Sequence, residues 1–204
     1  ATLIVNILPA IMPLIMWMLV REKVTGRELL GTAIALLGVI LLGWEDLQAS
    51  AETFRGDVSC FISMIFIALY LGLGRKNNDF ADLWLYVVPI YGISGVLCLI
   101  ATAVAGEPLL PANATEWWLL LGLGAIPTVL GHTILNYSIQ TMRGQIVSIF
   151  NLGQFIFAGI LAYFFFTEIP VWSFYIATVF VLIGALVVIM EAPDVAKEED
   201  HAEA

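Results

Sequence analysis

Charged residues are scarce in this sequence. Only 12% of the residues are Asp, Glu, Lys or Arg, and the mean hydropathy is +0.97. A soluble domain of ordinary composition carries roughly 25% charged residues. The shortage of charge therefore excludes a soluble globular fold and indicates an integral membrane protein.

The two-residue alternation of polar and apolar residues that marks membrane barrel strands is also missing. Apolar runs of about 18 or more residues take its place, and each can cross a hydrocarbon core of ~30 Å as a helix. We expect seven spans, at residues 1–20, 27–44, 57–74, 82–105, 117–139, 144–166 and 171–191. The predicted fold class is an all-α polytopic membrane helix bundle.

The motifs of a membrane enzyme are absent from the sequence. It contains no H-E-x-x-H, no G-x-S-x-G and no pair of intramembrane acids. His132 is the one intramembrane histidine, which excludes a haem with two histidine ligands. Cys60 and Cys98 fall within different spans and indicate no disulfide framework. We expect no catalytic residue, no metal site and no cofactor.

Basic residues are few, and their positions predict the topology. Only Arg55 falls in an even-numbered loop. The other seven fall in the odd-numbered loops or the tail: Arg21, Lys23, Arg27, Arg75, Lys76, Arg143 and Lys197. Under the positive-inside rule, the odd-numbered loops and the C-terminus are cytoplasmic. We expect a multi-pass protein of the cell (inner) membrane.

The net charge of −9 comes mainly from the loops and from the C-terminal tail "EAPDVAKEEDHAEA". Such a tail is typical of a solvated segment. We expect no nucleic-acid partner.

The sequence repeats itself with a shift of 146 positions. The shift aligns the first two spans with the last two, and it places Glu22 on Glu168, Thr32 on Thr178, Leu36 on Leu182 and Gly38 on Gly184. The shift covers five spans. Because this number is odd, the second copy is inverted in the membrane relative to the first. Inverted repeats are typical of transporters that bind substrate near the midplane of the bilayer.

Several segments resemble the EamA-type transporters of the drug/metabolite transporter superfamily. "GDVSCFISMIFIALYLGLGRK" resembles the helix that opens the second half of that family, "GHTILNYSIQTM" its Gly-His…Asn segment, and "FFFTEIPVWSFYIATVFVLIGALVVI" its final helix pair. Pro9 is similar to a proline of the first half, whereas Phe155 stands where the second half has its proline.

The resemblance implies ten helices in two halves of five, of which this chain would hold helices four to ten. It divides the chain into the end of the first repeat (1–46), an extracellular linker (47–56), the second repeat (57–191) and an acidic cytoplasmic tail (192–204). We expect three helices before Ala1, and we expect that the 204 residues alone do not transport.

Polar residues gather between positions 131 and 154, among residues that otherwise suit the bilayer core. His132, Asn136 and Gln140 are spaced four apart, so they share one face of a helix. Asn151 and Gln154 are three apart on the next, antiparallel helix. Unpaired polar groups at this depth cost several kcal/mol, and they must face protein or water.

We expect a substrate site lined by His132, Asn136, Asn151, Gln154, Tyr70 and Tyr137. Interhelical hydrogen bonding is the alternative role for the polar residues, and packing for the tyrosines. His132 is either a proton-coupling group or a neutral histidine bonded to Asn or Gln. Pro127 either frees a carbonyl for binding or only adjusts packing.

The predicted function is the transport, as an exporter, of small organic metabolites or drugs by alternating access. The alternatives are a non-transporting membrane subunit and, more weakly supported, an intramembrane enzyme. The expected partners are a small-molecule substrate and the lipid bilayer, and a homodimer is left open.

Overall fold

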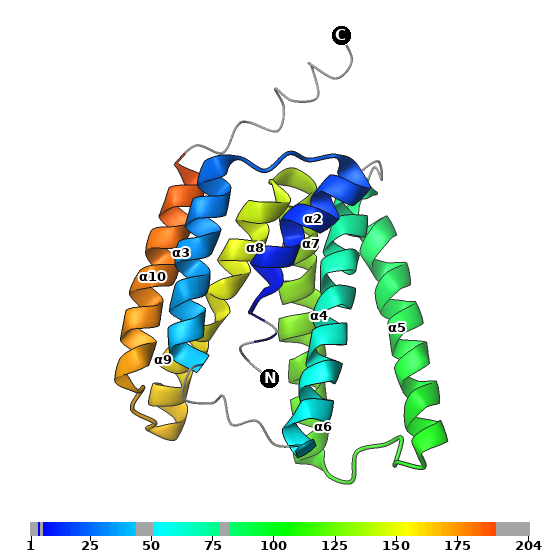
Figure 1. The fold of residues 1–204 in the computed structure, drawn as a ribbon. Coiled ribbons are helices and arrows are strands. Elements are labelled where there is room, and N and C mark those ends of the chain that lie inside the picture. The colour runs from blue at the N-terminus through cyan, green and yellow to red at the C-terminus, as the bar shows by residue number, and fades with distance from the viewer. Residues whose placement is uncertain (1–3, 5, 44–50, 78–81, 191–204) are drawn as a thin grey trace. The chain divides into compact units, whose positions relative to one another are not determined.

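The computed structural model describes residues 4, 6–43, 51–77 and 82–190. The predicted tail and residues 47–50 of the predicted linker lie outside these residues, whereas the structure places the other predicted linker residues, 51–56, in the helix that begins at Ala51. The described residues form helices and no strand (Figure 1). The helices are α2 (Leu8–Val20), α3 (Gly26–Gly43), α4 (Ala51–Lys76), α5 (Leu83–Ala105), α6 (Ala114–Leu123), the π-helix η1 (Gly124–His132), α7 (Thr133–Thr141), α8 (Gly144–Leu152), α9 (Gln154–Phe166) and α10 (Trp172–Ile189).

Six apolar helical spans in the described residues are long enough to cross a membrane. They are α3, most of α4, α5, the run from α6 to α7, the run from α8 to α9, and α10. The shorter α2, with 13 residues, accounts for the first predicted span. The predicted all-α polytopic bundle is confirmed.

The helices divide into two compact units. The first unit comprises α2, α3, α4, α8, α9 and α10, and the second comprises α5, α6, η1 and α7. Both copies of the sequence repeat belong to the first unit.

The two copies of the repeat have the same helix boundaries. α2 and α9 each have 13 residues, and α3 and α10 each have 18. Each pair begins and ends at positions that the shift relates. The first helix of each copy ends in a left-handed residue, Arg21 with a φ of 58° and Thr167 with a φ of 54°. The backbone is therefore equivalent in the two copies, although few side chains are identical.

The hydrogen bonds that end the first helix also correspond. Their donors and acceptors are related by the shift: Arg21 N–H to the Trp17 carbonyl, Glu22 to Met16, Thr167 to Tyr163 and Glu168 to Ala162. These bonds satisfy carbonyls that the end of a helix leaves without a partner. The sharp turn at the helix end is thus built in the same way twice.

α3 and α10 pack closely through small residues. A Cβ atom on Gly31 would lie 2.6 Å from the carbonyl oxygen of Gly184, and one on Gly38 would lie 2.9 Å from that of Ala177. The helices are antiparallel, because later residues of α3 contact earlier residues of α10. The shift of 146 positions relates Gly31 to Ala177 and Gly38 to Gly184. The contact of Gly31 with Gly184 in one copy therefore corresponds to the contact of Ala177 with Gly38 in the other. A two-fold axis across the helix pair produces this correspondence.

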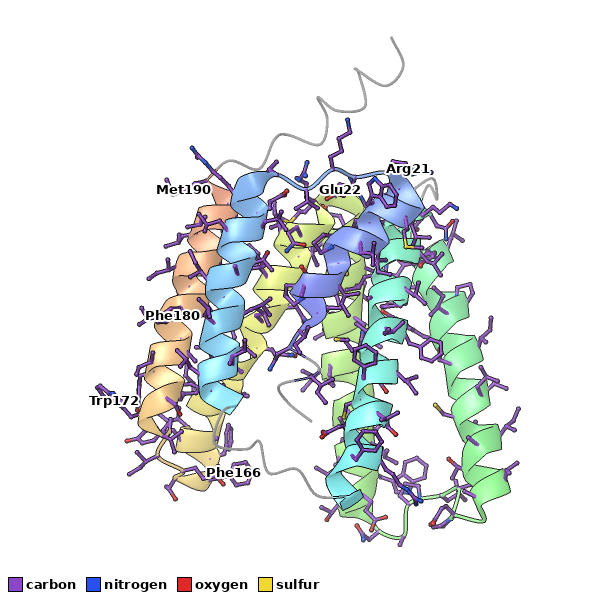
Figure 2. All side chains as sticks on the ribbon, viewed as in Figure 1. Arg21, Glu22, Phe166, Trp172, Phe180 and Met190 are labelled. Carbon is purple, nitrogen blue, oxygen red and sulfur yellow. The ribbon has the colours of Figure 1, made fainter. Side chains whose placement is uncertain are left out.

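The two interhelical loops lie at opposite ends of the first unit. Arg21 and Glu22 lie at the same end as Met190, whereas Phe166 and Trp172 lie at the other end (Figure 2). The second copy is thus inverted relative to the first, the arrangement of inverted-repeat transporters.

Close packing at Gly184 predicts a large steric effect. We expect Gly184→Val to lower the melting temperature in detergent, because a Cβ atom there would lie 2.5 Å from the Gly31 carbonyl oxygen. Overpacking of this kind costs about 1–3 kcal/mol. Gly95→Val is the control, since nothing lies within 4 Å of a Cβ atom at that position. Equal losses in the two variants would contradict the packing argument.

Candidate functional site

The helix predicted over residues 144–166 is interrupted in its middle. α8 ends at Leu152 and α9 begins at Gln154. Gly153 lies between them, and its N–H donates to the Phe150 carbonyl at 2.9 Å. Asn151, half-buried, and Gln154, exposed, flank this interruption. Discontinuous helices are typical of the midplane binding sites of transporters.

The first copy has the same backbone hydrogen bonds at the corresponding position, Ile7, where α2 begins. Ile7 donates to the Ile4 carbonyl at 3.2 Å and accepts from the Ala10 N–H at 2.8 Å, the same pattern as around Gly153. In this copy Pro9 contributes to this pattern, because proline has no N–H to continue a helix. The hydrogen-bond pattern is therefore common to both copies.

Phe155 occupies the position of the missing family proline. Its side chain is buried in a hydrophobic cluster, and its ring packs edge-on against Phe174 with centroids 5.7 Å apart. Gly153 has a φ of −58° and a ψ of −15°, close to the −77° and −4° of Ile7 at the corresponding position, so the second copy has the same local backbone without a proline.

In the second unit, the predicted polar stripe follows a π-helical segment. His132 is the last residue of η1, and its side chain is exposed. Asn136 is buried, and its Nδ2 donates to the His132 carbonyl at 2.7 Å. π-helical turns occur frequently at functional sites.

Pro127 lies inside this π-helical segment. The Thr128 hydroxyl donates at 3.1 Å to the carbonyl of Leu123, four residues before Pro127, which has no N–H to offer. The predicted distortion around Pro127 thus occurs beside a hydrogen bond from the Thr128 hydroxyl to the backbone.

The six predicted site residues are distributed over the two units. Tyr70, Asn151 and Gln154 belong to the first unit, and His132, Asn136 and Tyr137 belong to the second. Tyr70 is half-buried, and Tyr137 is 59% exposed. Because the two polar stripes lie in different units, their facing stays a prediction.

A buried charged cluster lies at the α2–α3 loop end of the first unit. It consists of Glu22 in the α2–α3 loop, Glu28 in the first turn of α3, Arg75 in the last turn of α4 and Arg143 before α8. The side chains of Glu28 and Arg143 are each 1% exposed. The cluster joins segments that are far apart in the sequence.

Glu28 and Arg143 form a bidentate pair. Nε of Arg143 donates to Oε1 of Glu28 at 2.7 Å, and Nη2 donates to Oε2 at 3.1 Å. Arg143 also donates to the Lys23 carbonyl. Thr25 and Glu28 form a capping box, in which the Thr25 N–H donates to Glu28 at 2.7 Å and the Glu28 N–H donates to Thr25 Oγ1 at 3.2 Å. Both carboxylate oxygens of Glu28 and its N–H are therefore hydrogen-bonded.

Glu22 is held by longer contacts. It accepts one hydrogen bond, from the Gly144 N–H at 3.2 Å, and lies 3.9 Å from Arg143 and 3.8 Å from Arg75. Its Oε2 accepts no hydrogen bond from the described residues. Burial raises the pKa of the Glu22 carboxyl, against the opposing effects of Arg143, Arg75 and the Gly144 N–H; the charge of Glu28 raises it further.

Glu22 should make the stability of the protein depend on pH. Because its pKa in the folded protein is raised above 4.5, the folded protein binds this proton more tightly than the unfolded chain. The stabilising contribution is complete below pH 4.5 and is lost as the pH rises through the raised pKa. We expect the melting temperature of wild type to fall relative to that of Glu22→Gln over this interval. A difference that does not vary with pH would contradict this assignment.

Gln145 joins the start of α8 to the first copy of the repeat. Pro13 has no N–H, so the carbonyl of Pro9 lacks its partner within α2. Nε2 of Gln145 donates to this carbonyl at 3.1 Å and also to the Thr32 hydroxyl. Gln145 thereby satisfies a backbone group that the helix itself leaves open.

The importance of this cluster is not recognised from the sequence alone, where Arg75 and Arg143 serve only as markers of topology. Two signals are present in the sequence. Thr25-x-x-Glu28 is a capping-box pattern, and acidic and basic residues alternate among helix ends on one predicted side of the membrane. Neither signal says which charges meet.

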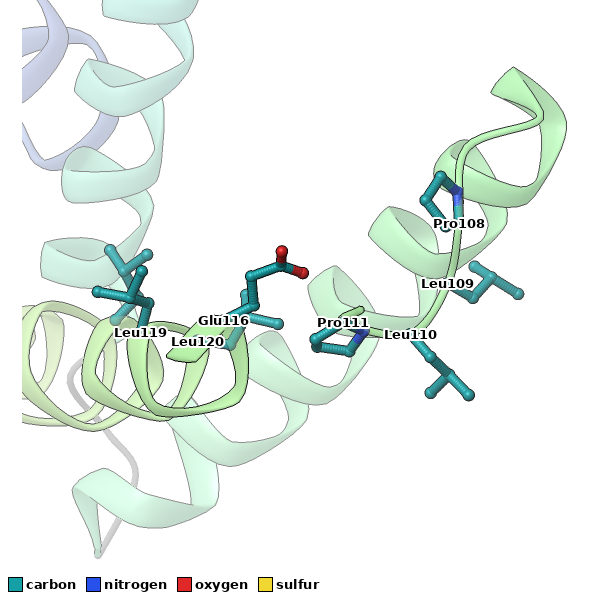
Figure 3. A pocket seen from close by; sticks show the side chains of 8 residues that line it. Pro108, Leu109, Leu110, Pro111, Glu116, Leu119 and Leu120 are labelled. Carbon is teal, nitrogen blue, oxygen red and sulfur yellow. The ribbon is translucent and has the colours of Figure 1, made fainter. Parts of the chain in front are cut away.

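A hollow of about 360 Å³ lies beside the α5–α6 loop (Figure 3). Its lining is apolar apart from Glu116, whose carboxylate accepts from the Ala112 N–H and the Asn113 Nδ2. None of the predicted site residues lines it. Glu116 is the one polar side chain among its lining residues.

The chain is similar to transporters of known sequence. Solute carrier family 35 member G1 of Homo sapiens is 24% identical over 186 residues, which cover 84% of this chain and 50% of that protein. An uncharacterized transporter of Archaeoglobus fulgidus is 24% identical over 169 residues, which cover 83% of this chain and 59% of that protein. The chain thus spans between half and three-fifths of the length of these curated relatives.

A crystal structure with 16% sequence identity has the same fold, with a TM-score of 0.80 over 93% of this chain and 66% of the other. Residues 54–190, which run from α4 through α10, match the EamA-like transporter family. The chain therefore belongs to the EamA-like family of membrane transporters.

Proposed function

We propose that the protein exports small organic metabolites or drugs by alternating access. The helix interruption at Gly153 and the matching hydrogen-bond pattern at Ile7 carry this proposal. They lie at related positions in two inverted copies, and polar side chains adjoin both: Asn6, which is 4% exposed, in the first, and Asn151 and Gln154 in the second. Alternating access in inverted-repeat transporters occurs around a site built from such interruptions.

The polar groups of the proposed path are neutral amides and one imidazole. Asn136, Asn151 and Gln154 offer both donors and acceptors, and His132 offers a ring nitrogen. Such groups replace part of the hydration of a polar substrate without burying a fixed charge. They suit small polar organic molecules better than ions.

Flux measurements test this proposal directly. Proteoliposomes containing the full-length protein should take up members of a panel of polar metabolites and drugs, and inside-out vesicles should accumulate the substrate that intact cells expel, whereas the 204 residues alone should not transport. A protein that moves no member of the panel in either direction would support the alternative of a non-transporting subunit.

We propose an orientation in the inner membrane with the α2–α3 loop and the C-terminus in the cytoplasm. Single cysteines at Asn77 and Asn113, in a background without Cys60 and Cys98, report on it. A membrane-impermeant thiol reagent applied to intact cells should label position 113 and spare position 77. The reverse pattern would overturn the orientation.

A further inference from the structure

The charged side chains of residues 21–28, between the end of α2 and the first turn of α3, are sorted by sign. Arg21, Lys23 and Arg27 are exposed, whereas the side chains of Glu22 and Glu28 are 7% and 1% exposed. In the sequence, the two acids largely offset the three basic residues of this segment. Folding withdraws both acids from the surface, so the segment presents basic side chains.

The two withdrawn acids have arginine partners inside the protein. Glu28 is paired with Arg143, and Glu22 lies 3.8 Å from Arg75. Two carboxylates and two guanidinium groups together have no net charge, and protonation of Glu22 would only add positive charge. The buried cluster therefore does not neutralise the basic side chains at the surface.

The end of α4 adds another exposed basic residue. Lys76 is exposed and follows Arg75, which lies against Glu22. Arg21, at the end of α2 (Figure 2), and Lys23 flank Glu22 in the chain. Two helix ends therefore meet at the contact of Glu22 with Arg75 and present three exposed basic side chains around it. We call Arg21, Lys23 and Lys76 the basic surface.

Trp17 fixes the level of the basic surface relative to lipid. The guanidinium carbon of Arg21 lies 5.1 Å from the centroid of the Trp17 ring, and Trp17 is 49% exposed. The Arg21 N–H donates to the Trp17 carbonyl where α2 ends. Exposed tryptophan side chains at the ends of spanning helices lie at the level of the lipid headgroups. The guanidinium group of Arg21 therefore lies where a lipid phosphate lies.

We propose that the basic surface binds the phosphate of an anionic phospholipid, whose acyl chains lie along α2. Leu14, Trp17, Met18 and Arg21 have the three- and four-residue spacing of one helix face. Leu14 and Met18 are 56% and 59% exposed, so this face is apolar along α2 and basic at its end. It matches a lipid in both parts, because clustered Lys and Arg beside a spanning helix attract anionic headgroups. The inference depends neither on the proposed transport nor on the proposed orientation.

The second copy of the repeat has no such surface. The shift of 146 positions places Thr167 on Arg21 and Ile169 on Lys23, and residues 167–171 contain no basic residue. The helix before this loop nevertheless ends with the same backbone hydrogen bonds. The turn therefore does not require the basic side chains of the first copy, and they are available to bind a ligand.

Native mass spectrometry of the full-length protein in mild detergent tests the lipid preference. Phosphatidylglycerol should bind with a lower dissociation constant than phosphatidylcholine, in which choline neutralises the phosphate. Lys23→Gln should raise the dissociation constant for phosphatidylglycerol about fivefold, the factor that corresponds to the usual contribution of one Lys or Arg at an anionic surface. Lys76→Gln should have the same effect, and the double variant should show an increase of about 25-fold.

Arg55→Gln is the matched control. Arg55 is an exposed basic residue near the start of α4, the helix that ends at Lys76, so the substitution removes the same charge at the opposite end of one helix. The affinity for phosphatidylglycerol should not change in this variant. The affinity for phosphatidylcholine should be the same in all variants.

Equal affinities of the wild-type protein for the two lipids would overturn the proposal, and they are the expected result if a segment outside residues 1–204 covers this face of α2. Equal losses in Lys23→Gln and Arg55→Gln would also overturn it. Displacement of the lipid by an equal concentration of glycerol phosphate would assign the surface to a soluble phosphate instead. Binding that appears only after deletion of residues 192–204 would show that the acidic tail is the occupant. None of these results depends on whether the protein transports a substrate.

Discussion

Glu28→Gln should lower the free energy of unfolding by about 3–5 kcal/mol, the usual cost of removing one partner of a buried ion pair. Glutamine at this position preserves the capping box with Thr25, because Gln serves there as well as Glu. The variant therefore isolates the loss of charge opposite Arg143. The measurement is thermal or denaturant unfolding in detergent, or the half-life at a fixed temperature if unfolding is irreversible.

Replacing both partners provides the control. Glu28→Leu with Arg143→Met removes both buried charges, and apolar replacement of a buried pair is often neutral or stabilising. The double variant should therefore recover most of the stability that the single variant loses, apart from about 1 kcal/mol for the lost cap. A single variant within about 1 kcal/mol of wild type would show that the pair contributes little.

Asn136→Leu and Gln154→Leu should each reduce substrate flux per folded molecule by about 10- to 100-fold. Each substitution leaves one polar group of the bound substrate without a hydrogen-bond partner, which costs roughly 1–3 kcal/mol and corresponds to this range. The melting temperature should change little, because in the proposed site neither side chain serves mainly to hydrogen-bond one helix to another. Flux normalised to folded protein and melting temperature in detergent are the two measurements.

Thr102→Val is the matched control for these variants. Its hydroxyl donates to the Cys98 carbonyl within the same helix, so its loss should leave flux unchanged. If Asn136→Leu and Gln154→Leu lower the melting temperature while normalised flux stays intact, the stripe is packing and the site assignment fails.

The helices and the repeat were accessible from the sequence because both depend on local patterns. Apolar run length predicted the spans to within a few residues over most of their length. The interruption at Gly153 was not predicted, since a single glycine inside an apolar run is compatible with an unbroken helix. The π-helical form of the segment around Pro127 was equally hidden, because proline marks a distortion without specifying its geometry.

The charged cluster escaped prediction for a different reason. Arg143 and Glu28 are separated by 115 positions, and Gly144 and Glu22 by 122. Their pairing depends on how α2, α3, α4 and α8 pack, which no local pattern encodes. The sequence placed these charges at helix ends on one side of the membrane, and the packing decided their partners.

A two-fold contact such as that between α3 and α10 can also be made by two identical chains, but identical chains must carry the same residues at both ends. Joining the two copies in one chain removes this constraint. Glu22 could then gain arginine partners at one end of the helix pair, while Glu168, on an equivalent backbone, gained none among the described residues. Covalent fusion thus permits a symmetric scaffold to have unequal faces, and a carrier with unequal faces can favour one resting orientation over the other.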